Sequence, residues 1–377
     1  MKWPQGVSSA ATASGIKSEG ADLGLMVFDA PATYAGVFTT NAAAAAPVIW
    51  SRSRIGRDIR ALVANSGNAN ACTGRDGVAA VQEESTAIAA ILGCSPDDVV
   101  VASTGPIGVK LPIDKIVGNL GGMKANLSDD PEPFARSLMT TDTYPKLAMA
   151  GMGEGTVLGV AKGAAMIAPN MATMLAFIVT DVACPQDRLQ TLLAEAVDAS
   201  FNRISVDACE STNDSVMCFS TGRTDGDLSR LEGALDEVCA SLAEQIVRDA
   251  EGGTKLMRIE VRGAADTAAA VALGKAVAAS DLWRCAVAGE DPNWGRVLSA
   301  MGSCDRRLEM GDVEVSIGSE LMFLRGEPVG RTEIAAKVMS FDEFSLVCVV
   351  GDGPGHAQVL AADLTTDYVR FNSEITT

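Results

Sequence analysis

The sequence is poor in the residues that most catalytic chemistries use. Histidine occurs once, at His356 inside the glycine-rich stretch 351–356, and we interpret it as a loop or turn residue. The nine cysteines form no CxxC pair, and no cluster of His, Cys and carboxylate residues has the spacing of metal ligands. A P-loop with its Lys-Ser/Thr ending and a dinucleotide-binding fingerprint are also missing. We therefore expect no metal, no cofactor and no histidine-based catalytic triad.

Long apolar runs and an excess of basic charge are absent as well. No stretch approaches the roughly 18 apolar residues of a membrane span, and the first residues lack the apolar core of a secretory signal. The net charge of −18 disfavours binding to nucleic acid or to an anionic membrane. An odd number of scattered cysteines is typical of reduced thiols. These observations predict a cytoplasmic protein that binds neither nucleic acid nor membranes.

Aromatic residues make up only 5% of the chain, whereas 47% of its residues are hydrophobic and 37 are glycine. The core is therefore expected to consist of aliphatic side chains that pack closely around small residues. A length of 377 residues is enough for two or three lobes, or for one large α/β body.

Apolar periodicity alternates between the patterns of strands and helices. Strands are expected at 23–28, 61–63, 99–102, 156–160, 174–179, 257–261, 313–317 and 346–350. Helices are expected at 77–92, from 131 to 139, from Pro185 onward, over 231–246 with an end near 251–253, and from 266 or 267 to 279. This alternation predicts the α/β class.

The most informative stretch is 162–181, KGAAMIAPNMATMLAFIVTD. Thr173 stands directly before an apolar run, and the small residue Ala172 precedes it. A self-processing nucleophile needs a hydroxyl that reaches the preceding carbonyl, a small neighbour and a rigid strand behind it. The same residues also suit an ordinary strand start, so the motif alone leaves both interpretations open.

Further blocks of unusual composition occur along the chain. They are 65–74 (NSGNANACTG), 103–108 (STGPIG), 139–143 (MTTDT), 249–255 (DAEGGTK), 289–296 (GEDPNWGR) and 368–377 (YVRFNSEITT). Together with 162–181 and in this order, they resemble the ornithine acetyltransferase family, the bifunctional glutamate N-acetyltransferase/ornithine acetyltransferases of arginine biosynthesis. The resemblance spans nearly the whole chain.

The resemblance implies mixed sheets sandwiched by helices, the N-terminal nucleophile fold shared by ornithine acetyltransferases and related aminopeptidases. It also implies self-cleavage between Ala172 and Thr173 into an α chain, 1–172, and a β chain, 173–377. Two copies of each chain would form a heterotetramer. The expected substrates are N2-acetyl-ornithine and glutamate, and whether acetyl-CoA also serves as a donor stays open.

The implied mechanism is ping-pong. Thr173 becomes acetylated, ornithine leaves and glutamate takes the acetyl group. A free α-amine titrates near pH ~7.7–8, so cleavage before Thr173 would create the general base and expose the nucleophile in one event. Thr104 and Gly105 would form the oxyanion hole, a role that backbone N–H groups and hydroxyls perform well. Without the resemblance, these two residues would be a plain turn at a strand end.

Substrate contacts are carried over by resemblance to Thr140, Lys162, Thr173, Glu251, Asn372 and Thr377. The repeated threonine leaves Thr141 as an alternative to Thr140. Judged alone, Lys162 would be an exposed lysine at a strand end, and the last residues would fray. The resemblance instead requires the C-terminal tail to fold back over the site.

Two departures from the family pattern stand out. Ala165 replaces the second glycine of a Lys-Gly-x-Gly signature, which matters only if the backbone there has a positive φ. In the block 207–214 (DACESTND), 208–210 differ from the usual Gly-Asp-Thr, which brings the conformation of that loop into question. The block 289–296 is interpreted as a packed turn without a catalytic role.

Two other functions remain open at this stage. A self-processing aminopeptidase or amidase of the same fold would use water in place of glutamate. A non-catalytic amino-acid-binding relative would have lost processing through the changes at Ala165 and 208–210.

Overall fold

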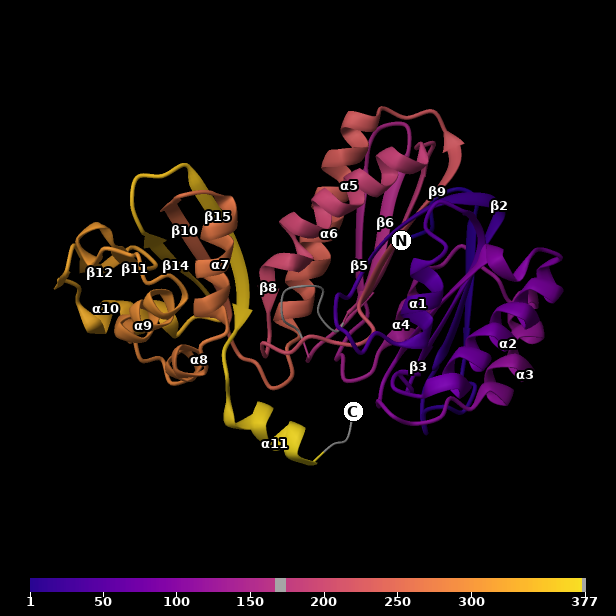
Figure 1. Cartoon of the computed structure of the whole chain (residues 1–377), viewed down its shortest axis with the longest axis horizontal. Coiled ribbons are helices and arrows are strands. Elements are labelled where there is room, and N and C mark those ends of the chain that lie inside the picture. Colours follow the sequence, from indigo (N-terminus) through magenta and orange to yellow (C-terminus); the bar gives the residue numbers. More distant parts are fainter. Residues whose placement is uncertain (167–173, 375–377) are drawn as a thin grey trace.

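Two mixed β-sheets, each covered by helices, form the two halves of the computed structural model, which describes residues 1–166 and 174–374 (Figure 1). The first sheet has the strand order β4-β3-β2-β9-β7-β6-β5, and β1 pairs with β2. Its strands are β1 (Val7–Thr12), β2 (Leu23–Phe38), β3 (Asp58–Ser66), β4 (Val99–Thr104), β5 (Lys146–Gly151), β6 (Thr156–Lys162), β7 (Leu175–Val182) and β9 (Ser215–Thr224).

The second sheet has the order β13-β12-β11-β14-β10-β15-β8. Its strands are β8 (Ile204–Ser205), β10 (Leu256–Ala264), β11 (Glu314–Ile317), β12 (Glu320–Leu324), β13 (Glu327–Pro328), β14 (Glu343–Val349) and β15 (Gly355–Ala362). The pairs β3/β4, β7/β9, β10/β14 and β8/β15 are parallel, and the remaining pairs are antiparallel. The α/β class with mixed sheets is therefore confirmed.

Helices of the described residues cover both faces of the first sheet and one face of the second. They are α1 (Ala46–Arg52), α2 (Gly74–Leu92), α3 (Ile113–Ala125), α4 (Glu132–Leu138), α5 (Gln186–Ala199), α6 (Leu228–Arg248), α7 (Thr267–Ala278), α8 (Asp281–Ala288), α9 (Trp294–Cys304), α10 (Thr332–Met339) and α11 (Thr366–Glu374). Three short 3₁₀ turns, Pro96–Asp98, Phe201–Arg203 and Met310–Asp312, join some of them.

The first sheet bends at β2, where the pairing register with β3 shifts between Val27 and Ala32. Alternate residues of β2 face opposite sides, as the period of a strand requires. Leu25 belongs to a cluster with α2 and α3 on the outer side. Phe28 belongs to an inner cluster, where its ring lies 4.8 Å from that of Phe219 in β9. The two halves of the bent sheet thus enclose an inner core, and helices cover the outside.

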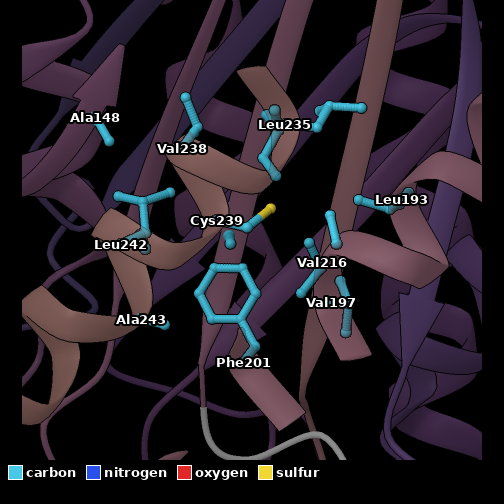
Figure 2. Close-up of a cluster of buried hydrophobic side chains, with 14 of the residues drawn as sticks. Ala148, Leu193, Val197, Phe201, Val216, Leu235, Val238, Cys239, Leu242 and Ala243 are labelled. Carbon is cyan, nitrogen blue, oxygen red and sulfur yellow. The ribbon is translucent and has the colours of Figure 1, made fainter. Parts of the chain in front are cut away.

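On the other outer side, α5 and α6 pack against β5, β6, β7 and β9 (Figures 1 and 2). The apolar stripe of α6 repeats at helical spacing, and Val238 and Leu242 lie on the sheet at Gly159. A Cβ at Gly159 would come within 2.7 Å of Leu242 and 2.8 Å of Val238. The glycine therefore lets the helix approach the strand closely, which explains how a core with few aromatic residues fills its volume.

The expected elements agree with the structure in type, and they differ in some boundaries. β2 continues ten residues beyond the expected end at Phe28. The helix expected to end at 251–253 ends at Arg248, and its C-cap is Asp249. His356 was expected in a loop, but it is the second residue of β15, where pairing with β10 extends the backbone. The block 289–296 is only partly a turn, because α9 begins at Trp294.

The strands that flank the segment 163–174 are neighbours. β6 and β7 pair antiparallel, with Lys162 opposite Leu175, and β7 also pairs parallel with β9. All nine cysteines lie in the described part of the chain as free thiols. Across residues 1–166 and 174–374, no helix is long and apolar enough to cross a membrane.

Replacing Leu242 by Ala should lower the free energy of unfolding by about 2–5 kcal/mol, because the deletion leaves a cavity between α6 and the sheet. Urea denaturation followed by circular dichroism measures the change. Leu282→Ala is the matched control, since that leucine is 65% exposed and its truncation should have little effect. Equal losses in the two variants would contradict this account of the core.

Candidate active site

A cavity of about 840 Å³ lies where loops from the first sheet meet the segment after α6 and the C-terminal helix. Among the residues that the sequence singled out, those that line it are Thr104, Gly105, Thr140, Thr141, Lys162, Ala165, Glu251 and Asn372. Residues 172, 173 and 377 of the expected site lie outside the described residues. Segments far apart in the sequence therefore converge on one cavity.

The expected oxyanion-hole residues stand at the end of β4. Thr104 is buried, and its carbonyl accepts a hydrogen bond of 3.0 Å from the N–H of Asn68. Gly105 has φ +137°, and a Cβ there would come within 2.5 Å of Asn68 N and 2.6 Å of Gly67 C. Only glycine suits this close approach of two backbones. The blocks 65–74 and 103–108 are thus packed against each other.

Asn213, in the block 207–214, hydrogen-bonds to both of these blocks. Its side-chain amide donates to the carbonyl of Ser103 at 2.8 Å and to that of Ala69 at 2.6 Å. Ser103 in turn donates to Asn65 Oδ1 at 2.7 Å. These contacts are buried, so they hold the end of β4 in a single arrangement.

Lys162 is the last residue of β6, and it is 3% exposed. The alternative of an exposed strand-end lysine is therefore wrong. Its ammonium lies 3.4 Å from Thr104 Oγ1 and 4.0 Å from Asp142 Oδ2. Burial lowers the pKa of Lys162, and the charge of Asp142 opposes that shift. A cation and the expected oxyanion-hole hydroxyl thus share one wall of the cavity.

Asp142 is the hub behind this wall, and the sequence analysis did not assign it a role. Its Oδ1 accepts from Lys146 Nζ at 2.7 Å and from Gly163 N–H at 2.6 Å, and its Oδ2 accepts from Thr140 N–H at 3.0 Å. Burial alone would raise the pKa of Asp142, but the charges of Lys162 and Lys146 and these hydrogen bonds outweigh it and hold the pKa at about 2.

Lys146 extends the network to a second block. It also pairs with Asp249 at 2.6 Å, and Asp249 accepts from the N–H of Thr143 at 3.0 Å and from its hydroxyl. Both aspartates lie inside blocks that the sequence analysis quoted, 139–143 and 249–255. Their position in these blocks was the one feature of the sequence that could have drawn attention to the two aspartates. Lys146, which pairs with both, lies outside the blocks.

Glu251 is buried beside the loop that follows β6, and its N–H donates to the carbonyl of Ala164 at 2.9 Å. The C-terminal helix reaches it: Asn372 Nδ2 donates to Glu251 Oε2 at 3.0 Å. Helix α11 extends away from the second sheet to reach this site (Figure 1). At its start, Tyr368 packs so closely on Gly252 that a Cβ there would lie 2.5 Å from Tyr368 N. Within the described residues, the tail thus brings Asn372 to the cavity.

The two departures from the family pattern leave the described loops in place. Ala165 is not among the residues with positive φ, so the change from glycine costs nothing there. Ala208 has φ +58°, a conformation that glycine adopts more easily. Asp207 nevertheless holds its loop, because Oδ1 accepts from Cys209 N–H at 3.2 Å and Oδ2 accepts from Met166 N–H at 2.5 Å.

Asp214 lies next to the expected cleavage segment and was also missed. It is fully buried, and its Oδ1 accepts from the N–H of Met174 at 2.9 Å. Burial raises the pKa of Asp214 well above its ordinary value. Its place at the end of the block 207–214 was the only sequence signal.

His356 does not line the cavity; it lies on an exposed stretch of β15, where Nε2 is 3.0 Å from Glu260 Oε1. Among the described residues, no group of three or more His, Cys, Asp or Glu side chains could hold a metal ion. The polar side chains that line the cavity carry hydroxyl, ammonium, carboxylate, amide and thiol groups.

Comparison with known proteins identifies the family of this chain. The chain matches the ArgJ family over residues 8–377. This chain belongs to the ArgJ family. A glutamate N-acetyltransferase of Methanopyrus kandleri is 40% identical over 381 residues, which cover 96% of this chain and 97% of that relative. An arginine biosynthesis bifunctional protein ArgJ of Brucella suis is 40% identical over 390 residues, which cover 98% of this chain and 94% of that relative.

A solved structure of the ArgJ protein from Bacillus halodurans is also similar. It has 33% sequence identity and a TM-score of 0.51, and the match covers 53% of this chain and 98% of that chain. The fold of 53% of this chain is therefore found in a solved relative.

Replacing Asp142 by Asn should cost about 3–5 kcal/mol of unfolding free energy near neutral pH, because it removes one of the two carboxylates that pair with buried Lys146 and the carboxylate that faces buried Lys162. The folded-state pKa of about 2 lies below the ordinary 3.8, so the unfolded chain binds the proton first as the pH falls. Asp142 thus stabilises the fold above about pH 4, and this stabilisation is lost toward pH 2.

The difference in unfolding free energy between wild type and Asp142→Asn should therefore decrease by about 1 kcal/mol from about pH 5 to about pH 3. Urea denaturation at the two pH values measures it. Asp352→Asn, at an exposed loop position, is the control and should track wild type. A gap that stays constant with pH would contradict the depressed pKa.

Proposed function

We propose that this chain transfers the acetyl group of N2-acetyl-ornithine to glutamate by a ping-pong mechanism, through an acetyl-Thr173 intermediate. Its family makes it an acyltransferase of arginine biosynthesis. The observation that carries the proposal is one cavity lined by Thr104, Gly105, Lys162 and the Glu251–Asn372 pair. These groups supply hydrogen-bond donors for an oxyanion and charges for an amino-acid substrate.

In the proposed first half-reaction, the hydroxyl of Thr173 attacks the acetyl carbonyl and the α-amine of Thr173 takes the proton. The developing oxyanion accepts hydrogen bonds from Thr104 and from the N–H of Gly105. Lys162 donates to Thr104 Oγ1, so the hydroxyl proton of Thr104 is free to point toward the oxyanion. The bond to the α-nitrogen of ornithine then breaks, and the proton passes to the leaving amine.

In the second half-reaction, the α-amine of glutamate attacks the acetyl carbonyl and the ester bond to Thr173 Oγ breaks. The α-amine of Thr173 takes the proton from the attacking amine and returns it to Oγ, and N-acetyl-glutamate leaves. Glu251 is the natural counter-charge for the side-chain ammonium of ornithine, and Asn372 holds that carboxylate in place. Thr140 and Thr141 both line the cavity, so either one is placed to contact the substrate. Acetyl-CoA remains an alternative donor to be tested in the same assay.

The proposed cleavage between Ala172 and Thr173 yields the fragments 1–172 and 173–377. They would stay together after the cut, because β6 and β7 are hydrogen-bonded neighbours from opposite sides of the junction. We further propose that two α and two β chains form a heterotetramer, and that the protein is cytoplasmic. The free cysteines support the cytoplasmic location, because thiols stay reduced there. Hydrogen bonds hold the residues next to Ala165 and Ala208: Glu251 N–H donates to Ala164, and Cys209 N–H donates to Asp207. This order speaks against a relative that has lost catalysis.

The first test is self-cleavage. Purified wild type should give two masses, for residues 1–172 and 173–377, under denaturing conditions, and Thr173→Ala should stay whole because it lacks the nucleophilic hydroxyl. Thr173→Ser is the matched control, since it keeps a hydroxyl and should still be cut. Intact-mass analysis measures all three. A wild-type chain that transfers acetyl groups while uncut would overturn the free-amine mechanism.

The second test concerns Thr104. Thr104→Ala should lower kcat by about 100-fold or more, because one oxyanion donor is lost. The rate is measured on protein whose cleavage has first been verified by mass, so that a processing defect is not counted as a catalytic one. Thr104→Ser keeps the hydroxyl and should retain much of the activity. An unchanged kcat in Thr104→Ala removes this residue from the mechanism.

A further inference from the structure

Lys17 lines the cavity of the proposed active site, and neither the sequence motifs nor the resemblance assigns it a role. We propose that Lys17 binds the side-chain carboxylate of glutamate and so selects the acetyl acceptor. The inference rests on the proposed function and names the residue that recognises the second substrate.

The loop that carries Lys17 connects β1 to β2, and a buried carboxylate holds it together. Asp22 accepts hydrogen bonds from the N–H groups of Ser14 at 2.6 Å, Gly15 at 3.1 Å and Lys17 at 2.9 Å. The carbonyl of Asp22 accepts from the N–H of Ser66 at the end of β3, at 2.9 Å. Lys17 therefore stands on a preorganised loop that is tied to the sheet.

The stem of Lys17 packs on the backbone beside the proposed oxyanion hole. A Cβ at Gly67 would come within 2.7 Å of Lys17 Cγ, so this glycine leaves room for the lysine. Gly67 in turn packs against Gly105: a Cβ added at Gly105 would lie 2.6 Å from Gly67 C. The methylene chain thus runs along the backbone beside the proposed oxyanion hole, and Lys17 is one of the residues that line the cavity.

The ammonium of Lys17 has donors to spare. It donates to the carbonyl of Met139 at 2.9 Å, and an ammonium has three N–H groups. Within residues 1–166 and 174–374 it forms no salt bridge, whereas Lys162 and Lys146 both face Asp142. Half-burial lowers the pKa of Lys17, and the charges of Asp22 and Asp142 oppose that shift. Lys17 is therefore a fixed cation beside Thr140 that can take an incoming carboxylate.

The two substrates differ most at the end of the side chain. Ornithine ends in an ammonium, which suits Glu251, and glutamate ends in a carboxylate, which Glu251 repels. One cavity must bind both in turn, so glutamate needs a cation that ornithine does not. Lys162 is deep and engaged with Thr104 and Asp142, which leaves Lys17 as the better-placed partner.

The experiment separates the two half-reactions in Lys17→Met, which keeps the stem and removes the charge. The enzyme is first acetylated with N2-acetyl-ornithine, freed of product, and then given either glutamate or isotopically labelled ornithine as acceptor. Acetyl-enzyme formation and transfer to ornithine should be unchanged. The glutamate concentration for half-maximal transfer should rise about 10- to 100-fold, as expected for a lost hydrogen bond to a charged group.

Lys17→Arg should restore part of the glutamate transfer, because it returns the charge. Lys115→Met is the matched control: this exposed lysine donates to Gly15 of the same loop but does not line the cavity. An equal loss with both acceptors, or no loss with either, overturns the role of Lys17. A wild-type enzyme that never becomes acetylated overturns the proposed function itself, and the mass of the intact protein distinguishes that case.

Discussion

The buried carboxylate of Asp142 is the contact on which the site depends. It holds Lys146, approaches Lys162, and fastens the backbone N–H groups of Thr140 and Gly163. Two buried lysines would otherwise repel each other, at a cost of several kcal/mol. With the carboxylate in place, the end of β6, the block 139–143 and, through Lys146, the segment after α6 become one rigid unit.

Close backbone packing serves the same end at the other wall of the cavity. Gly67 and Gly105 bring two loops into van der Waals contact, and Gly252 does so between the segment after α6 and the start of α11. Larger residues would force these loops apart. The abundance of glycine in the chain thus acts at the site as well as in the core, where Gly159 admits α6 to the sheet.

The cavity combines charges of both signs. Lys17 and Lys162 stand with Glu251 around one space, and Asn372 from the last helix completes the anionic side. Such a cavity can accept a zwitterionic amino acid with either a cationic or an anionic side chain. The proposed ping-pong mechanism requires this property, because in it the two amino-acid substrates would occupy the same place at different times.

The sequence by itself determined the class of the fold and the type of most elements, because apolar periodicity and helix caps are local signals. Its resemblance to a known family also pointed to Thr104, Gly105, Lys162, Glu251 and Asn372, which composition and spacing alone would not have singled out. Only the tertiary structure decided that these blocks meet, that Lys162 is buried rather than exposed, and that α6 ends before Glu251. Some of the contacts that define the site join residues more than a hundred positions apart in the sequence. Examples are the bonds of Lys146 to Asp249 and of Lys17 to Met139. Contacts of that range depend on how the bent sheet and its helices pack, and no local pattern encodes them.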